Sequence, residues 1–132
     1  MLRNIRRLPV ALLKLLAKRF SRKTRLGLTE RVVVFGLWKN KTVTAKIDTG
    51  ATKSSIDAML ARELGLGPVV RTAVVRTTHG IAKRDVVVAK VKIGHRIIVA
   101  DFTVAKRSHM KYGILIGQNI LKRGFIIDPS KG

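Results

Sequence analysis

The sequence contains no cysteine, so it can form neither disulfide bonds nor thiolate metal sites. Its three histidines, His79, His95 and His109, are widely spaced, and no His-Glu-x-x-His pattern is present, so a catalytic zinc site would lack its ligands. A Gly-x-x-x-x-Gly-Lys phosphate loop is also missing, and nucleotide binding therefore has no support. We expect no metal ion and no cofactor.

Acidic residues are scarce as well. The chain has 7 acidic residues against 28 basic ones, which gives a net charge of +21. Such a charge indicates an anionic partner (nucleic acid, a ribosome, an acidic membrane or an acidic peptide), although it would serve solubility equally well. The length of 132 residues and the hydrophobic content of 46% are typical of one globular domain with a modest core.

The first 25 residues are rich in Lys and Arg and contain no acidic residue. Pro9 suits the first turn of a helix, and the residues after it have the spacing of an amphipathic helix too short to cross a bilayer. We expect a basic N-terminal segment, residues 1–28, that contacts an anionic membrane or RNA through residues 1–25. A solvated tail without a role is the alternative. We expect the protein to be cytoplasmic, with membrane association through this segment. One face of the helix would carry the apolar residues Leu12, Leu13, Leu16 and Phe20. The other face would carry the basic residues Lys14, Lys18 and Arg22.

After Gly27 the sequence changes from a helical to a strand-like pattern, so the globular domain is expected over residues 29–132. Short apolar runs alternate with tight turns, which favours an all-β fold with a closed or barrel-like sheet and little helix. Asp57 is a good N-cap and Gly65 a good stop for one short helix between them. The expected strands cover residues 31–37, 41–47, 54–56, 69–77, 84–93, 96–105, 113–116 and 124–128, and the expected helices residues 58–64 and 118–123.

One of the few acids stands at the end of an alternating strand. Val43, Ala45 and Ile47 share one face, and Asp48-Thr49-Gly50 follows directly. A carboxylate beside an apolar strand is costly unless it is paired or hydrogen-bonded, and Gly50 would let another group approach it closely. An ordinary Asx turn would also explain this tripeptide.

A second stretch gives the first one more weight. Residues 113–121 read Gly-Ile-Leu-Ile-Gly-Gln-Asn-Ile-Leu: bulky apolar residues, a Gly, and the start of a short helix. The order and spacing of the two motifs resemble the retropepsin-like (retroviral-type) aspartic proteases, in particular the cellular group known as ATP-dependent zinc proteases. The resemblance spans about residues 30 to 130. It implies a retropepsin-like half-barrel with one or two short helices, in which the strand before the second Gly passes behind the Asp loop.

Peptide hydrolysis by carboxylates alone needs two of them sharing one proton, so that one acts as acid and the other as base. This chain has one Asp-Thr-Gly, so an aspartic endopeptidase would have to be a homodimer with Asp48 of each copy on the two-fold axis. The resemblance implies the same arrangement. It assigns catalysis to Asp48, Thr49 and Gly50, and substrate contact to Ala51 and to a flap at Thr77, Thr78, His79 and Gly80. A peptide or protein substrate, favoured if acidic by the positive charge, would be the partner.

Two positions differ from the retroviral pattern. Thr52 and Gln118 stand where those proteases have an Asp and an Arg that form a charged pair supporting the dimer. Neutral contacts or the closing strand would have to replace that pair. Because two copies also bring together twice the positive charge, we expect weak dimerisation that salt promotes. The alternative function is a catalytically inactive retropepsin-like module that binds an anionic partner such as RNA, a ribosome or an acidic membrane.

Overall fold

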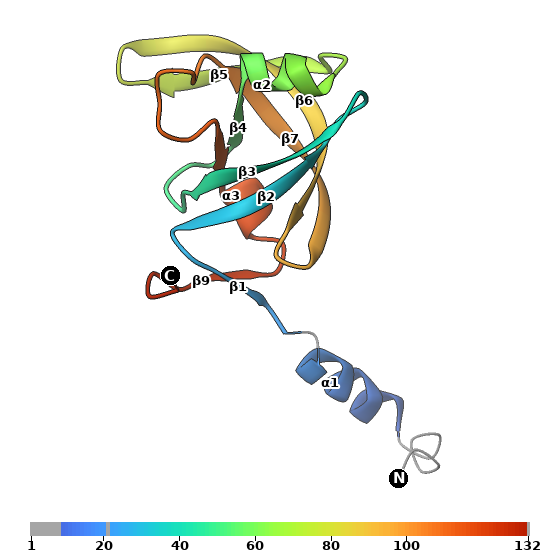
Figure 1. Ribbon diagram of the computed structural model, residues 1–132. Helices are drawn as coiled ribbons and strands as arrows, with labels where there is room; N and C mark the ends of the chain where they lie inside the picture. Colours follow the sequence, from blue (N-terminus) through green and yellow to red (C-terminus); the bar gives the residue numbers. More distant parts are fainter. Residues whose placement is uncertain (1–8, 21, 132) are drawn as a thin grey trace.

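The computed structural model describes residues 9–20 and 22–131. It begins with a helix and continues with short strands, two of which are followed by short helices (Figure 1). The elements are α1 (Val10–Phe20), β1 (Thr24–Leu26), β2 (Thr29–Phe35), β3 (Asn40–Ile47), β4 (Ser54–Asp57), α2 (Ala58–Leu64), β5 (Arg71–Thr77), β6 (Gly80–Ile93), β7 (Arg96–Ala105), β8 (Ile114–Ile116), α3 (Gln118–Leu121) and β9 (Phe125–Ile127).

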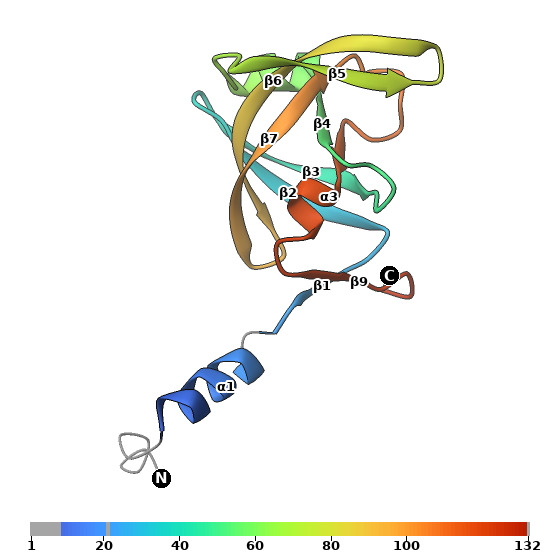
Figure 2. The same ribbon diagram turned by 180° about the vertical axis from the view of Figure 1, so that it is seen from behind.

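Six strands close into a barrel. The sheet runs in the order β2-β3-β8-β4-β7-β6, and pairing between β2 and β6 closes it. β3 with β8 and β4 with β7 are parallel, whereas the other neighbours are antiparallel. β5 extends the sheet beyond β6, and the two form a long hairpin at one end of the barrel (Figures 1 and 2). The predicted all-β fold with a closed, barrel-like sheet is therefore confirmed.

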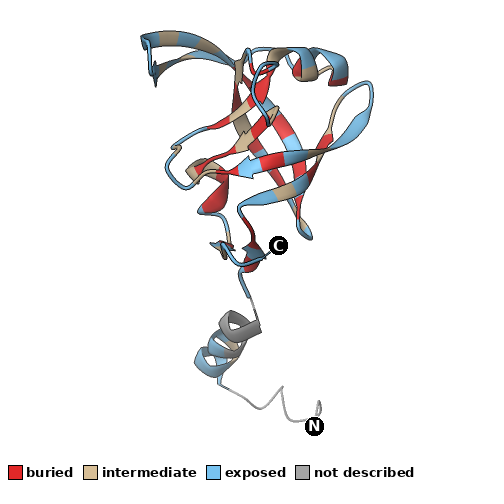
Figure 3. Ribbon diagram, turned by 60° about the vertical axis from the view of Figure 1, so that its left-hand side comes forward, coloured by how far each residue is buried: buried red, intermediate tan, exposed pale blue. Residues whose placement is uncertain are grey.

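The barrel interior is filled by residues that alternate along the strands. In β6, Val87, Ala89, Val91 and Ile93 are buried, whereas the intervening lysines are exposed. β7 has the same period, with its inward residues centred on the fully buried Phe102. Figure 3 shows this alternation as bands of buried and exposed residues along the strands. The core is thus the product of the two-residue period expected for half-buried strands.

The short helix α2 begins and ends where the sequence predicts. The Asp57 carboxylate accepts a hydrogen bond from the Leu60 N–H, and Gly65 adopts the left-handed conformation with φ of 73°. Gly65 also packs against Trp38, because a Cβ at this position would lie 2.8 Å from the indole. Both caps supply partners or geometry that the ends of a helix otherwise lack.

The β5–β6 hairpin is longer than its sequence pattern suggests. β6 was expected from residue 84, but it begins at Gly80, because the ladder continues to the pair Thr77–Gly80 and leaves only Thr78 and His79 as the turn. The polar and charged residues of this stretch hide the strand period. β5 in turn begins at Arg71, two residues later than predicted.

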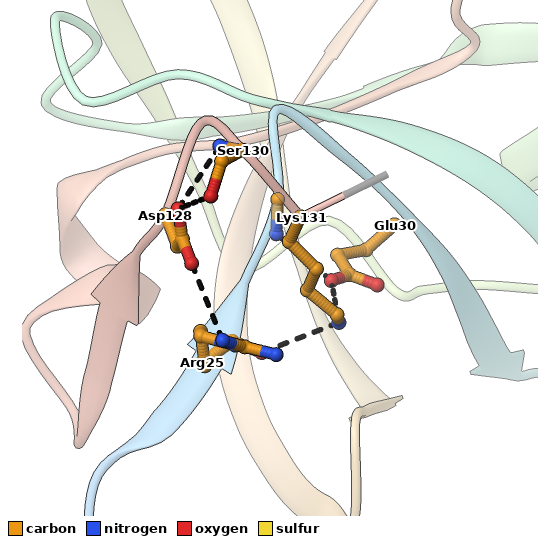
Figure 4. A network of polar contacts seen from close by, with 6 residues as sticks. Arg25, Glu30, Asp128, Ser130 and Lys131 are labelled. Carbon is orange, nitrogen blue, oxygen red and sulfur yellow. Dashed lines mark hydrogen bonds and ion pairs between the residues drawn. The ribbon is translucent and has the colours of Figure 1, made fainter.

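The two ends of the described barrel domain are joined by a parallel pair of strands, β1 and β9. The Asp128 carboxylate accepts hydrogen bonds from Ser130 and forms an ion pair with Arg25 (Figure 4). Lys131 forms an ion pair with Glu30. Leu26 in β1 is fully buried in the core. Strand structure therefore starts inside the N-terminal segment of residues 1–28, and the division at residue 28 itself remains a prediction.

Helix α1 starts directly after Pro9, whose carbonyl accepts the N–H of Leu13. Leu12 and Leu15 are exposed. The side chains of Leu16, Lys18 and Phe20, on which part of the predicted amphipathic pattern rests, lie outside the described residues. Among the described helices, none is both long and apolar enough to span a bilayer.

Candidate active site

Asp48 stands where β3 leaves the barrel wall. Its backbone N–H donates to the Ile116 carbonyl at 2.9 Å, and its carboxylate accepts the N–H of Gly50 at 3.0 Å. The Ala51 N–H closes the turn onto the Asp48 carbonyl at 3.3 Å. Asp48 is half-buried, while Thr49 and Gly50 are exposed. This loop between β3 and β4, residues 48–53, is the Asp loop. It holds one carboxylate in a fixed orientation and leaves it open to solvent.

The second motif lies directly behind this loop. β8 inserts between β3 and β4, with Ile116 opposite Ile47 in parallel register and Leu115 opposite Ser55 in antiparallel register. The strand before Gly117 therefore passes behind the Asp loop, as the resemblance implies. Gly117 is required for this approach, because a Cβ at this position would lie 2.4 Å from the Lys53 carbonyl oxygen.

The start of α3 is bonded to the Asp loop through its backbone. The N–H of Gln118 donates to the Ala51 carbonyl at 2.8 Å, and that of Asn119 to the Thr52 carbonyl at 3.2 Å. The Gln118 side chain donates to the Thr49 carbonyl at 2.7 Å. This is a neutral contact at the position where the retroviral pattern has an arginine. Within the chain, Gln118 therefore supports the loop without a charge.

A polar network behind the loop fixes its distance from the barrel wall. The Ser54 hydroxyl donates to the Asn119 side-chain oxygen at 2.7 Å and accepts the Gly117 N–H at 3.0 Å. The Asn119 amide nitrogen donates to the Asp101 carbonyl at 3.0 Å. Ser54 is fully buried, and every buried side-chain polar atom of the described residues has a hydrogen-bond partner. Satisfied networks of this kind rigidify a site.

A cleft of about 570 Å³ lies between the Asp loop and the β5–β6 hairpin. Of the predicted site residues, Gly50, Ala51 and Thr77 line it. Asp48 and Thr49 lie next to the cleft without lining it, and Thr78, His79 and Gly80 do not line it either. Thr78, His79 and Gly80 form the exposed turn of the hairpin, where the His79 N–H donates to the Thr77 hydroxyl at 3.2 Å. The residues expected to act as a flap are thus at the tip of a projecting hairpin, with its stem over the cleft.

The cleft is lined by cations and by no acidic residue. Lys53 comes from the Asp loop, Arg76 from β5, Arg84 from β6 and Arg107 from the loop after β7. Sequence reasoning identified none of these four as site residues. The remaining lining residues are Thr52, Ser55, Val74, Val75, Thr103, Ala105 and Leu115. A cleft with this lining favours an anionic ligand.

Arg107 differs from the other three because it is nearly buried, with 9% of its surface exposed. Its Nε donates to the Tyr112 carbonyl at 3.1 Å, and its backbone N–H donates to the Asp57 carboxylate at 2.7 Å. Burial lowers the pKa of Arg107, and the charges of Asp57 and Asp48 oppose this shift. No carboxylate of the described residues forms an ion pair with its guanidinium. The only available signal in the sequence was a basic residue just after a buried strand.

The other histidines take no part in the cleft. His95 and His109 are exposed, as expected for turn and loop residues. The His95 ring lies 3.3 Å from the Thr24 hydroxyl, next to β1. Nowhere in residues 9–20 and 22–131 do three His, Asp or Glu side chains gather as metal ligands.

Comparison with known families places this geometry in context. Residues 61–132, more than half of the chain, match the family model described as RimB-like, retropepsin-like aspartic endopeptidase RimB. The chain belongs to this family. The RimB-like match contains the second motif, the hairpin and Arg107, and it begins after the Asp48 loop. A search of curated proteins found no match.

Solved structures support the retropepsin-like fold of this RimB-like chain. Protein Lpg0085, of unknown function, from Legionella pneumophila subsp. pneumophila str. Philadelphia 1, is 22% identical with a TM-score of 0.57, over 80% of this chain and 93% of its own. EIAV protease complexed with the inhibitor HBY-793 is 19% identical with a TM-score of 0.59, and the match covers 72% of this chain and 85% of the viral one. Simian foamy virus (mac) protease is 18% identical with a TM-score of 0.52, and the match covers 71% of this chain and 91% of the viral one.

Proposed function

We propose that the protein is an aspartic endopeptidase that hydrolyses peptide bonds as a homodimer. The observation that carries this proposal is the position of Asp48. Its carboxylate is fixed by the Gly50 N–H, and its loop is held from behind by Ile116 and Gly117 next to an open cleft. In the dimer, Asp48 of each copy would share one proton. One carboxylate would take a proton from the attacking water while the other gives one to the substrate carbonyl oxygen.

The second carboxylate has to come from a second copy, because no other acid of the described residues lies in the loop of Asp48 or lines the cleft. Asp57 caps α2 and is buried. Asp85 is exposed in β6, across the ladder from Thr72. The others form ion pairs away from the Asp loop: Glu30 with Lys131, Glu63 with Lys39 and Lys41, Asp101 with Arg71, and Asp128 with Arg25. Thr49 and Gly50, both exposed beside Asp48, would then meet their copies across the two-fold axis.

The lining of the cleft supports an acidic peptide as substrate. Lys53, Arg76, Arg84 and Arg107 place four cations around the space beside Ala51 and Thr77. Substrate carboxylates would be attracted electrostatically, and a guanidinium can bind a carboxylate through two parallel hydrogen bonds. Thr78, His79 and Gly80, at the tip of the hairpin, would contact the substrate only after the hairpin closes over it.

The test compares the wild-type protein with Asp48→Asn and with the matched control Asp85→Asn, on a peptide library that contains acidic and neutral peptides. We expect the wild type and Asp85→Asn to cleave peptides and a pepstatin-type compound to inhibit this cleavage. Asp48→Asn should cleave none of the peptides. Specific activity should rise with protein concentration, since the site needs two copies. Cleavage that survives Asp48→Asn, or no cleavage by the folded wild-type dimer, would overturn the proposal.

A further inference from the structure

The outer surface of β2, β3 and β6 carries cations that the proposed peptidase chemistry does not use. Arg31 in β2, Lys46 in β3, and Lys90 and Lys92 in β6 are all exposed. We call this surface the basic face. None of the four lines the cleft. No residue of β2 or β3 lines the cleft, and in β6 the cleft residue Arg84 lies six residues before Lys90.

The strand register gathers these side chains on one side of the sheet. Lys90 lies opposite Phe35, and Lys92 opposite Val33, in the β2–β6 ladder. Being two residues apart on one strand, the two lysines are separated by about 7 Å along it. Arg31 lies opposite Thr44, and Lys46 opposite Thr29, in the β2–β3 ladder. Diagonal neighbours in such ladders are about 7–8 Å apart, so the cations form a continuous group.

No carboxylate neutralises this group. Within the described residues, none of Arg31, Lys46, Lys90 and Lys92 forms an ion pair. The acid on the same side of the sheet, Asp101, lies opposite Val88 and is paired with Arg71. Glu30, next to Arg31 in the chain, is paired with Lys131. No acid of the described residues therefore offsets the charge of this group by an ion pair.

We propose that the basic face binds double-helical nucleic acid through its phosphate groups. Lys and Arg supply the phosphate contacts, and the exposed hydroxyls of Thr42 and Thr44 add hydrogen-bond donors on the same face. Binding to single strands normally requires aromatic side chains on which bases stack. Within the three strands of this face the aromatic residue is Phe35, whereas Trp38, in the turn between β2 and β3, packs against Gly65 at the end of α2. Phe35 is half-buried, and the Lys90 ammonium lies over its ring, 5.1 Å from the ring centre. The face is therefore suited to a phosphate backbone rather than to unpaired bases.

The experiment measures binding of short RNA and DNA duplexes to the full-length chain by fluorescence anisotropy over a range of salt concentrations. The test variant is Lys90→Gln/Lys92→Gln, and the matched control is Lys14→Gln/Lys23→Gln in the N-terminal segment, which removes the same charge. The slope of log affinity against log salt is negative, and we expect its magnitude to decrease by about 2 in the test variant, because each lost phosphate contact contributes about 0.9. The slope of the control should change less than that of the test variant. The two duplexes tell whether the ribose hydroxyl contributes.

Three results would overturn the proposal. One is an unchanged slope in the Lys90→Gln/Lys92→Gln variant. Another is a larger change of the salt slope in the control variant, which would assign duplex binding to the N-terminal segment. The last is a variant that loses affinity for anionic lipid vesicles but not for duplexes, which would make the face a membrane contact. Both lysines are exposed, so thermal unfolding should change little, and Lys90→Arg/Lys92→Arg should keep the wild-type binding. Peptide cleavage should be unaffected, so this proposal and the peptidase proposal can fail separately.

Discussion

Gly117 and Lys53 approach each other so closely that a Cβ on Gly117 would lie 2.4 Å from the Lys53 carbonyl oxygen. The same Cβ would lie 2.9 Å from the Ala51 carbonyl oxygen. Both oxygens belong to the backbone of the Asp loop and cannot move without moving the loop. The distance between the two sequence motifs is thus set by the absence of a side chain.

We expect Gly117→Ala to destabilise the protein by about 1–3 kcal/mol, the usual cost of overpacking, and to abolish peptide cleavage by displacing Asp48. Denaturant unfolding and a cleavage assay measure the two effects. Gly113→Ala is the control in the same stretch, because its Cβ would meet nothing closer than 3.8 Å, from the Leu60 side chain. Equal losses of stability in the two variants would contradict this account.

Gln118→Met should weaken the Asp loop without changing the size of the side chain much. It removes the hydrogen bond to the Thr49 carbonyl. A hydrogen bond of this kind contributes about 1 kcal/mol, so kcat/KM should fall about fivefold if the loop geometry limits the reaction. Lys122→Met, at an exposed position just after α3, should leave kcat/KM unchanged. An unchanged kcat/KM in Gln118→Met would mean that this contact does not support the site.

Arg107→Gln should reduce cleavage of acidic peptides by about tenfold or more, because hydrogen bonds to charged groups contribute about 1.5–3 kcal/mol. Neutral peptides should be cleaved nearly as before. Arg107→Lys should give an intermediate result, since an ammonium keeps the charge but cannot make the paired hydrogen bonds of a guanidinium. The measurement is kcat/KM for acidic and neutral peptides of equal length. A parallel loss on both peptides would assign Arg107 a structural role.

The carboxylate of Asp128 provides a test by pH. Hydrogen bonds from Ser130, followed by the charge of Arg25, lower the pKa of Asp128 below its ordinary value of 3.8. Because the folded state binds the proton less readily, Asp128 contributes stability above the ordinary pKa. That contribution is lost as the pH falls through the folded value. In Ser130→Ala the pKa of Asp128 should rise, as measured by NMR titration. Ser108→Ala, at an exposed position elsewhere, should leave it unchanged.

Dimerisation should become stronger with salt. Each chain carries a net charge of +21, and salt screens repulsion between exposed charges over about 10 Å at 0.1 M. Sedimentation equilibrium at low and high salt measures the effect. A tight dimer whose dissociation constant ignores salt would contradict the prediction, and a strict monomer at high concentration in every buffer would contradict the shared site.

Local features of the fold were predictable because each depends on a few neighbouring residues. The alternation of Val87, Ala89, Val91 and Ile93 gives a buried strand face, and Asp57 caps a helix through the backbone of its own first turn. The meeting of the two motifs followed from a resemblance, which supplies a long-range contact that periodicity cannot. The position of Asp48 in front of β8 is such a case.

Other features could not be predicted because they depend on which strands become neighbours. A two-residue period tells which face of β4 or β7 is buried, but it does not tell that the two strands are parallel neighbours. The burial of Arg107 depends on the loop that returns over it through Tyr112. Neither the charge of Arg107 nor its place just after a strand indicates this burial. The cations of the cleft were missed for the same reason.

The parallel pairing of β1 with β9 has a consequence for how the molecule is made. Thr24 and Phe125 are register partners although about a hundred residues separate them in the chain. On a translating ribosome, the first strand would stay without its partner until nearly all of the barrel has emerged. The ladder between β1 and β9 therefore belongs among the last parts of the molecule to form, after the barrel strands that precede Phe125 in the chain.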